Sequence, residues 1–136
     1  MAGSGDVVMQ HIEAFNARDR DAEPWAADAE MVAPGATVTG RDEVLRFLGA
    51  FQEAFPDGRL EVKRLLVDGS SAPVEGVFAG THDGVLHAPD GAVAATGKPV
   101  EFRWAAVYGV RDHQLASEHL YFDQADLLGQ LGLLPD

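Results

Sequence analysis

One stretch decides the fold: SEHLYFDQ at residues 117–124, followed by ADLLGQLGLL at residues 125–134. Its first half alternates and carries aromatic residues, a pattern typical of a half-buried strand. Its second half has leucines at helical spacing, and Gly132 ends the predicted helix. Asp123 lies at the junction of strand and helix, and the functional interpretation depends on it.

Upstream of this stretch, the pattern predicts helices first. Val8, Ile12 and Phe15 form an apolar stripe that predicts a helix over 6–18. A short second helix is expected from about Asp21, with Trp25 after it as a core or pocket residue. A long helix is expected to follow a capping box at Thr39 and Asp42 and to end near Phe55.

In the rest of the chain, apolar and polar residues alternate with a period of two, a pattern that predicts strands. Between two of them, residues 82–98 form a long excursion with a Pro89-Asp90-Gly91 turn, and long loops of this kind often act as functional lids. The chain is therefore expected to be one α+β domain over 1–136, in which helices pack on the concave face of a curved, cone-shaped antiparallel sheet. The expected strands lie at Met31–Ala33, Thr37–Thr39, Arg59–Val67, Val74–Thr81, Val100–Val110 and in the closing stretch.

Composition and charge exclude several classes of function. The chain has 136 residues, enough for one domain with a substantial core. Its 22 acidic and 10 basic residues give a net charge of −12, which argues against nucleic acid or an anionic membrane as a partner. The absence of cysteine excludes disulfides and thiolate catalysis. We expect a cytoplasmic protein, because the start resembles no signal peptide and the apolar runs are far shorter than the ~20 residues of a membrane span.

Asp123 allows two interpretations. As a helix cap it would accept from the first turn of the helix, with Asp126 at the third helical position. As a general acid/base it would lie at the closed end of the cone, where aromatic neighbours would raise its pKa toward working pH. His119 and Tyr121 are expected on the same face as Asp123. A regular strand separates His119 from Asp123 by about 13 Å, so these two cannot share a metal.

Other residues are candidates for lining a small-molecule site. Phe15, Trp25, Phe51 and Trp104 are each either core residues or part of a ligand platform. His82 is expected near the mouth of the cone. The histidines and carboxylates have no recognised ligand spacing, so no metal is expected.

The closing stretch resembles the end of the SnoaL-like polyketide cyclases, a family of the nuclear transport factor 2-like (NTF2-like) superfamily. The resemblance covers nearly the whole chain. It rests also on Phe15-Asn16, Phe55-Pro56-Asp57, Gly80-Thr81-His82-Asp83-Gly84 and Thr96-Gly97-Lys98-Pro99-Val100-Glu101. It implies a cone-shaped α+β barrel, often assembled into a dimer or larger oligomer through the outer face of the sheet. It further implies that Asp123 is the general acid/base of a metal-free and cofactor-free intramolecular aldol condensation.

The first expectation is therefore a cyclase that acts on a hydrophobic, carbonyl-bearing small molecule, with Tyr121, His119 and Trp104 positioning the substrate. Two alternatives stay open: a proton-shuttling isomerase of the ketosteroid isomerase type, and a non-catalytic ligand-binding or dimerisation module. Leu120 and Phe122, opposite in phase to Asp123, are expected to point outward. Because an uncovered apolar sheet face favours association, we expect a homodimer or homotetramer.

Overall fold

The computed structural model describes residues 3–88 and 91–134; Pro89 and Asp90, from the predicted turn, lie outside the described residues. Its helices are α1 (Ser4–Ala17), the short 3-10 helix η1 (Arg20–Ala22), α2 (Arg41–Ala54) and α3 (Gln124–Gln130). Its strands are β1 (Trp25–Ala33), β2 (Ala36–Thr39), β3 (Arg59–Leu65), β4 (Ser71–Thr81), β5 (Leu86–Ala88), β6 (Gly91–Val93), β7 (Pro99–Arg111) and β8 (Gln114–Phe122).

The long helices form where the apolar spacing predicts them, but their ends differ. The stripe of Val8, Ile12 and Phe15 is buried in α1. The capping box predicted from Thr39 and Asp42 is wrong: α2 follows Gly40, and in the described part of the chain no side chain caps it. Glycine suits this position because its φ is 97°, a conformation that side chains with a Cβ rarely adopt.

The second predicted helix is reduced to one short turn. Asp19, not Asp21, caps η1 by accepting from the backbone N–H of Ala22 at 3.2 Å. Trp25 then opens strand β1, and its indole is buried in the core. Residues 25–33 are rich in alanine and have little intrinsic preference for a strand, so pairing with β2 and β8 makes this segment a strand.

The main sheet of the described chain is mixed rather than antiparallel. Its strand order is β2-β1-β8-β7-β4-β3, and β1 runs parallel to β8 while the other neighbours are antiparallel. The all-antiparallel prediction is therefore wrong at this pair. A parallel pair needs a long crossover, and here β1 and β8 come from opposite ends of the chain.

A bulge in β8 reverses the predicted phase of the closing strand. Gly109 of β7 pairs with Ser117, but the next residue, Val110, pairs with Leu115, so one residue of β8 is unpaired. Beyond the bulge, Glu118 is buried, and Leu120 and Phe122 are half-buried on the inner face. A shift of one residue moves every side chain to the other face. The expectation that Leu120 and Phe122 point outward is therefore wrong.

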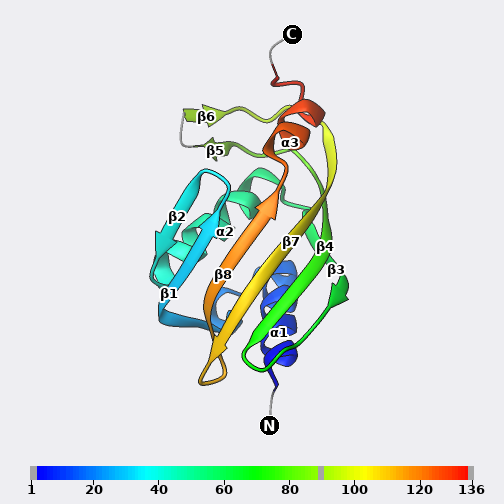
Figure 1. Cartoon of the computed structure of the whole chain (residues 1–136). Coiled ribbons are helices and arrows are strands. Elements are labelled where there is room, and N and C mark those ends of the chain that lie inside the picture. Colours follow the sequence, from blue (N-terminus) through cyan, green and yellow to red (C-terminus); the bar gives the residue numbers. More distant parts are fainter. Residues whose placement is uncertain (1–2, 89–90, 135–136) are drawn as a thin grey trace.

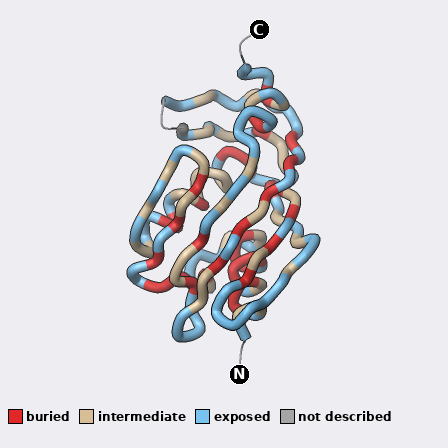
Figure 2. Tube along the Cα trace, in the orientation of Figure 1, coloured by how far each residue is buried: buried red, intermediate tan, exposed pale blue. Residues whose placement is uncertain are grey.

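The molecule has two layers, with α1 and α2 behind the concave face of the curved sheet (Figure 1). The hydrophobic core lies between these layers, and the central strands alternate buried and exposed residues along their length (Figure 2). The architecture is α+β, as predicted, with a curved sheet that does not close into a complete barrel. In the described ranges, every helix is too short or too polar to cross a bilayer.

The outer face of the sheet carries fewer large apolar side chains than the sequence suggests. With Leu120 and Phe122 turned inward, the large apolar side chains that β7 and β8 expose are Val107 (43%) and Tyr121 (59%). The apolar patch predicted from Leu120 and Phe122 is smaller as a result, and self-association stays a prediction.

A cavity with one polar end

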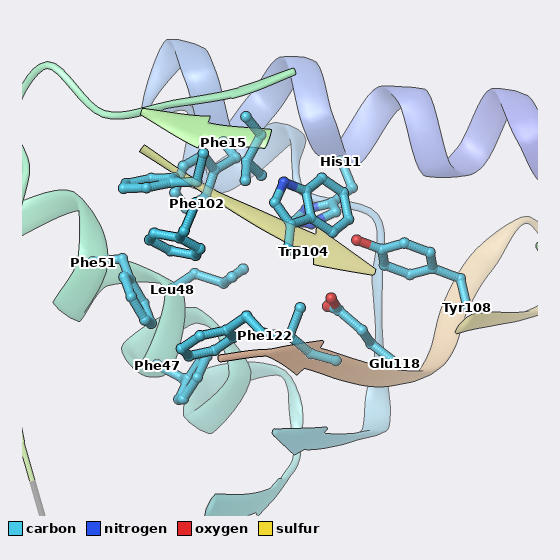
Figure 3. Close-up of a pocket in the computed structure, with 13 residues that line it drawn as sticks. His11, Phe15, Phe47, Leu48, Phe51, Phe102, Trp104, Tyr108, Glu118 and Phe122 are labelled. Carbon is cyan, nitrogen blue, oxygen red and sulfur yellow. The ribbon is translucent and has the colours of Figure 1, made fainter. Parts of the chain in front are cut away.

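A cavity lies between the concave face of the sheet and helices α1 and α2. The empty space among its lining residues amounts to about 470 Å³, part of which is open solvent at its mouth. Aromatic rings surround most of it, and polar groups gather at one end, next to Trp104 (Figure 3). Such a lining suits an apolar molecule that carries a few polar groups at one end. The lining residues are His11, Phe15, Phe47, Leu48, Phe51, Leu60, Phe78, Phe102, Trp104, Tyr108, Glu118, Leu120 and Phe122.

Tyr108 and Glu118 form the polar end. They are direct partners across the β7–β8 pair, so their side chains project from the same face of the sheet. Both are buried, and the hydroxyl of Tyr108 lies near the carboxylate of Glu118 (Figure 3). Oε1 of Glu118 has no hydrogen-bond partner among the described residues. The carboxylate therefore keeps one acceptor free toward the cavity (Figure 3).

The surroundings of Glu118 shift the pKa of its carboxyl toward neutral pH. Burial raises its pKa to about 7, against the opposing effects of the charge on His11 and of the nearby hydroxyl of Tyr108. Burial also raises the pKa of Tyr108 well above its usual value, and the neighbouring Glu118 adds to that rise. Tyr108 therefore stays protonated near neutral pH, whereas a pKa of about 7 allows Glu118 to gain or lose its proton there.

Trp104 supplies the second free polar atom. Its indole lies flat against β4 because its cross-strand partner is Gly76, where a Cβ would come within 2.5 Å of the ring. Its Nε1 is buried and has no acceptor in the described part of the chain. A buried donor without a partner costs about 1–3 kcal/mol, so this N–H is suited to a ligand oxygen.

His11 joins the polar end from helix α1. It is buried, and its Nδ1 lies 2.5 Å from Oε1 of Glu23, a buried residue that precedes β1. Burial lowers the pKa of His11, but the hydrogen bond and charge of Glu23, followed by the charge of Glu118, outweigh it and leave the pKa raised. The Nε1–H of Trp25 donates to the same oxygen of Glu23 at 3.2 Å.

The structure places three of the sequence-predicted residues at the cavity. Phe15, Phe51 and Trp104 all line it. Trp25 lies outside the lining and packs edge-on against His11, with ring centroids 5.2 Å apart. Its contribution to the site is thus indirect, through His11 and Glu23.

The other predicted residues lie away from the cavity. Asp123, Tyr121 and His119 are all exposed, because the β8 bulge turns this face outward. Asp123 has the role of the first interpretation: it caps α3 by accepting from the backbone N–H of Asp126 at 3.1 Å. Its expected place at the floor of the cone is wrong.

His82 is buried rather than at a mouth. Its Nδ1 lies 3.0 Å from Oγ1 of Thr96, and its ring packs on Phe55 with centroids 5.5 Å apart. It holds the chain that leads from the β5–β6 hairpin to β7, since its carbonyl oxygen accepts from Gly97 and its N–H donates to Lys98.

Sequence reasoning did not assign roles to Glu118, Tyr108 and His11. For His11 a signal existed: it lies in the stripe of Val8, Ile12 and Phe15, where a polar residue marks a buried polar site. For Glu118 the signal depended on the bulge, which only pairing with β7 reveals. The described residues contain no group of three or more histidines or carboxylates that could hold a metal ion.

Comparison with known proteins agrees with this architecture. The SnoaL-like polyketide cyclase family model matches residues 5–131. The chain belongs to the SnoaL-like polyketide cyclase family. A search of the curated proteins gave no match.

Solved structures include close matches of fold. IdmH from Streptomyces antibioticus, a proposed polyketide cyclase, is 26% identical with a TM-score of 0.80, covering 96% of this chain and 99% of its own. A proposed SnoaL-like polyketide cyclase from a Jannaschia species is 19% identical with a TM-score of 0.84, covering 97% and 93%. A protein of ketosteroid isomerase-like fold from Catenulispora acidiphila is 21% identical with a TM-score of 0.78, covering 95% and 94%.

Proposed function

We propose that this SnoaL-like domain is a cofactor-independent enzyme that closes a ring in an apolar, carbonyl-bearing small molecule by an aldol-type reaction. The observation that carries the proposal is a pair of free polar atoms in one apolar cavity: an acceptor on Glu118 and a donor on Trp104. Buried polar atoms are normally paired, and those left free mark a place where a ligand supplies the partner.

The chemistry follows from these two atoms. Ionised Glu118 takes a proton from the carbon beside a substrate carbonyl, and the electrons of that C–H bond move into an enolate. The indole N–H of Trp104 donates to the enolate oxygen and stabilises its charge. The enolate carbon then attacks a second carbonyl of the same molecule, which forms the ring bond and an alkoxide. Protonated Glu118 returns its proton to that alkoxide, so the proton balance closes and no oxidant is needed.

The aromatic end of the cavity supports binding of the rest of the substrate. Phe51, Phe78, Phe102 and Phe122 form a chain of ring contacts with centroid separations of 5.2–6.1 Å. Burying an apolar ring system against them would supply affinity, at roughly 25 cal/mol per Å² of buried apolar surface. Exclusion of water there would also strengthen the electrostatic interactions at the polar end.

Proton abstraction can be tested without the natural substrate. A bicyclic aromatic ketone such as β-tetralone has exchangeable protons beside its carbonyl, and NMR in D₂O follows their replacement by deuterium. The parent protein is expected to accelerate this exchange above the buffer rate. Glu118→Gln should reduce the protein-dependent rate by on the order of 100-fold. Asp123→Asn is the matched control, since it alters an exposed carboxylate outside the cavity, and should retain the rate.

The outcomes separate the candidate functions. Equal exchange by the parent and Glu118→Gln would overturn the role of Glu118. Ketone binding without exchange by the parent would instead indicate a ligand-binding module. With extended dicarbonyl substrates, a cyclised product supports the cyclase, whereas a migrated double bond would indicate an isomerase that uses the same proton shuttle.

A further inference from the structure

The pair of His11 and Glu23 lies behind the polar end of the cavity. His11 lines the cavity, whereas Glu23 does not and meets it only through the imidazole ring. Both side chains are buried, with residue exposures of 1% for His11 and 5% for Glu23. A buried carboxylate needs a charged or strongly donating partner, because desolvation otherwise makes its ionised form costly.

Several contacts fix the position of Glu23. Its Oε1 accepts from Nε1–H of Trp25 at 3.2 Å and lies 2.5 Å from Nδ1 of His11. Its backbone carbonyl oxygen accepts from the guanidinium of Arg41 at 2.6 Å. The carboxylate thus points at His11 from a fixed backbone, with one oxygen engaged by two donors.

The ring of His11 is fixed as well. It packs edge-on against Trp25 at 5.2 Å and against Tyr108 at 5.8 Å between ring centroids. An ionised carboxylate can only accept hydrogen bonds, so the nitrogen facing Glu23 must carry a proton. In neutral His11 the other nitrogen, Nε2, is then an unprotonated acceptor, and it is the nitrogen that the ring can offer to the cavity.

We propose that Glu23 is a positioning residue that holds His11 in its Nδ1–H tautomer, so that Nε2 acts as a second proton acceptor of the cavity. The use of Nε2 in turnover rests on the proposed function, whereas the control of the tautomer by Glu23 does not. The titratable groups that face His11 are Glu23 from the segment before β1, Tyr108 from β7 and Glu118 from β8. A purely structural pair would tie α1 to the segment before β1 and would leave the pH profile of turnover unchanged.

The test measures the nitrogen atoms of the intact protein directly. Two-bond ¹H–¹⁵N NMR of the ¹⁵N-labelled chain distinguishes the two neutral histidine tautomers and the doubly protonated ring across a pH series. In the parent, His11 should titrate from the doubly protonated ring to the Nδ1–H tautomer. If neutral His11 in the parent carries its proton on Nε2, the proposal is overturned, whatever the behaviour of any variant.

The variant Glu23→Gln removes the charge and lets the facing group donate as well as accept. The signals of His11 should then show a substantial Nε2–H population, and its titration midpoint should fall by on the order of one pH unit. Unchanged tautomer and midpoint in a folded Glu23→Gln would contradict the proposal. His82 is the internal control, because its Nδ1 faces Thr96 rather than a carboxylate, and its signals should not move. Trp25→Phe, which removes the second donor but keeps the carboxylate, should preserve the Nδ1–H tautomer.

A kinetic arm links the tautomer to chemistry. If the parent exchanges the ketone protons, Glu23→Gln should lower the rate at least about tenfold and shift the pH profile, with little change in ketone affinity. A proportional loss of ketone binding with no shift in the profile would indicate a structural role alone. If the parent exchanges nothing, the proposed function fails, while the NMR result still decides whether Glu23 sets the tautomer.

Discussion

Replacing Glu118 with glutamine should stabilise the fold above neutral pH while removing its proposed chemistry. The pKa of Glu118 is about 7 in the folded protein, against 4.5 for an ordinary glutamate. At about 1.4 kcal/mol per pH unit, ionising this buried side chain costs about 3 kcal/mol more in the folded state than in the unfolded chain. Glutamine has nearly the same shape and carries no charge.

The sign of the effect depends on pH. Below about pH 4.5 the carboxyl is protonated in both states, and Glu118 adds no pH dependence. Between that pH and about 7 the folded state holds the extra proton, so this contribution to stability falls as pH rises. His11, whose pKa is also raised, contributes stability that is fully present below its unfolded pKa and is lost as pH rises through its folded pKa. In Glu118→Gln the contribution of residue 118 to the pH dependence of stability disappears. The contribution of His11 weakens, because a carboxylate no longer supports the charge on its ring.

The expected gain is therefore about 1–3 kcal/mol at pH 8 and close to zero at pH 4.5. Urea unfolding followed by tryptophan fluorescence at both pH values measures it, provided that the slope with denaturant is unchanged. Glu75→Gln, at an exposed glutamate on β4, is the matched control and should show no comparable gain. A Glu118→Gln protein whose stability follows that of the parent at both pH values would refute the inference that Glu118 ionises at a cost inside the cavity.

Three further predictions test the cavity wall, the helix cap and the absence of a metal requirement. Gly76→Ala should destabilise the protein by about 1–3 kcal/mol and perturb the fluorescence of Trp104, because its Cβ would lie 2.5 Å from the indole. Gly49→Ala, inside α2, should instead stabilise by about 0.5–1 kcal/mol in the same unfolding assay, because its Cβ would make only an ordinary contact with the guanidinium of Arg20 at 3.8 Å. Asp123→Ala should lower stability by about 0.5–2 kcal/mol and Asp123→Asn should not, while both keep ketone binding; loss of binding by folded Asp123→Asn would return this residue to the site. A chelator should leave the melting temperature and the exchange rate unchanged, and a stoichiometric metal in the purified protein would contradict this.

The parts of the fold that sequence reasoning could predict depend on local patterns. Helix α1 follows from Val8, Ile12 and Phe15, since an apolar stripe at helical spacing has one way to be buried. The cap at Asp123 is equally local, because the side chain and the N–H of Asp126 that it accepts are three residues apart. Such features need no knowledge of which strands pair.

The candidate site depends on contacts that a single sequence does not reveal. After the bulge, Leu120 and Phe122 face the cavity, whereas Tyr121 between them faces solvent. All three are large and apolar enough for either face, so their pattern does not choose the phase. The choice comes from the pairing of Gly109 with Ser117 and from the packing of Phe122 against Phe51 of α2, with ring centroids 6.1 Å apart.

Because the phase of β8 depends on strand pairing, the sequence predicts a functional carboxylate in the closing stretch but selects Asp123 rather than Glu118. Asp123 can be satisfied by its own helix, so it needs nothing from the cavity. Glu118 lies near the hydroxyl of Tyr108 and has one oxygen without a partner among the described residues, and its ionisation costs about 3 kcal/mol. Such a cost is consistent with the proposed function, in which Glu118 acts together with the free donor of Trp104 in the same cavity. Glu118→Gln should thus raise the stability of the fold above neutral pH and lower the rate of proton exchange, because both changes come from removing one buried ionisable carboxyl.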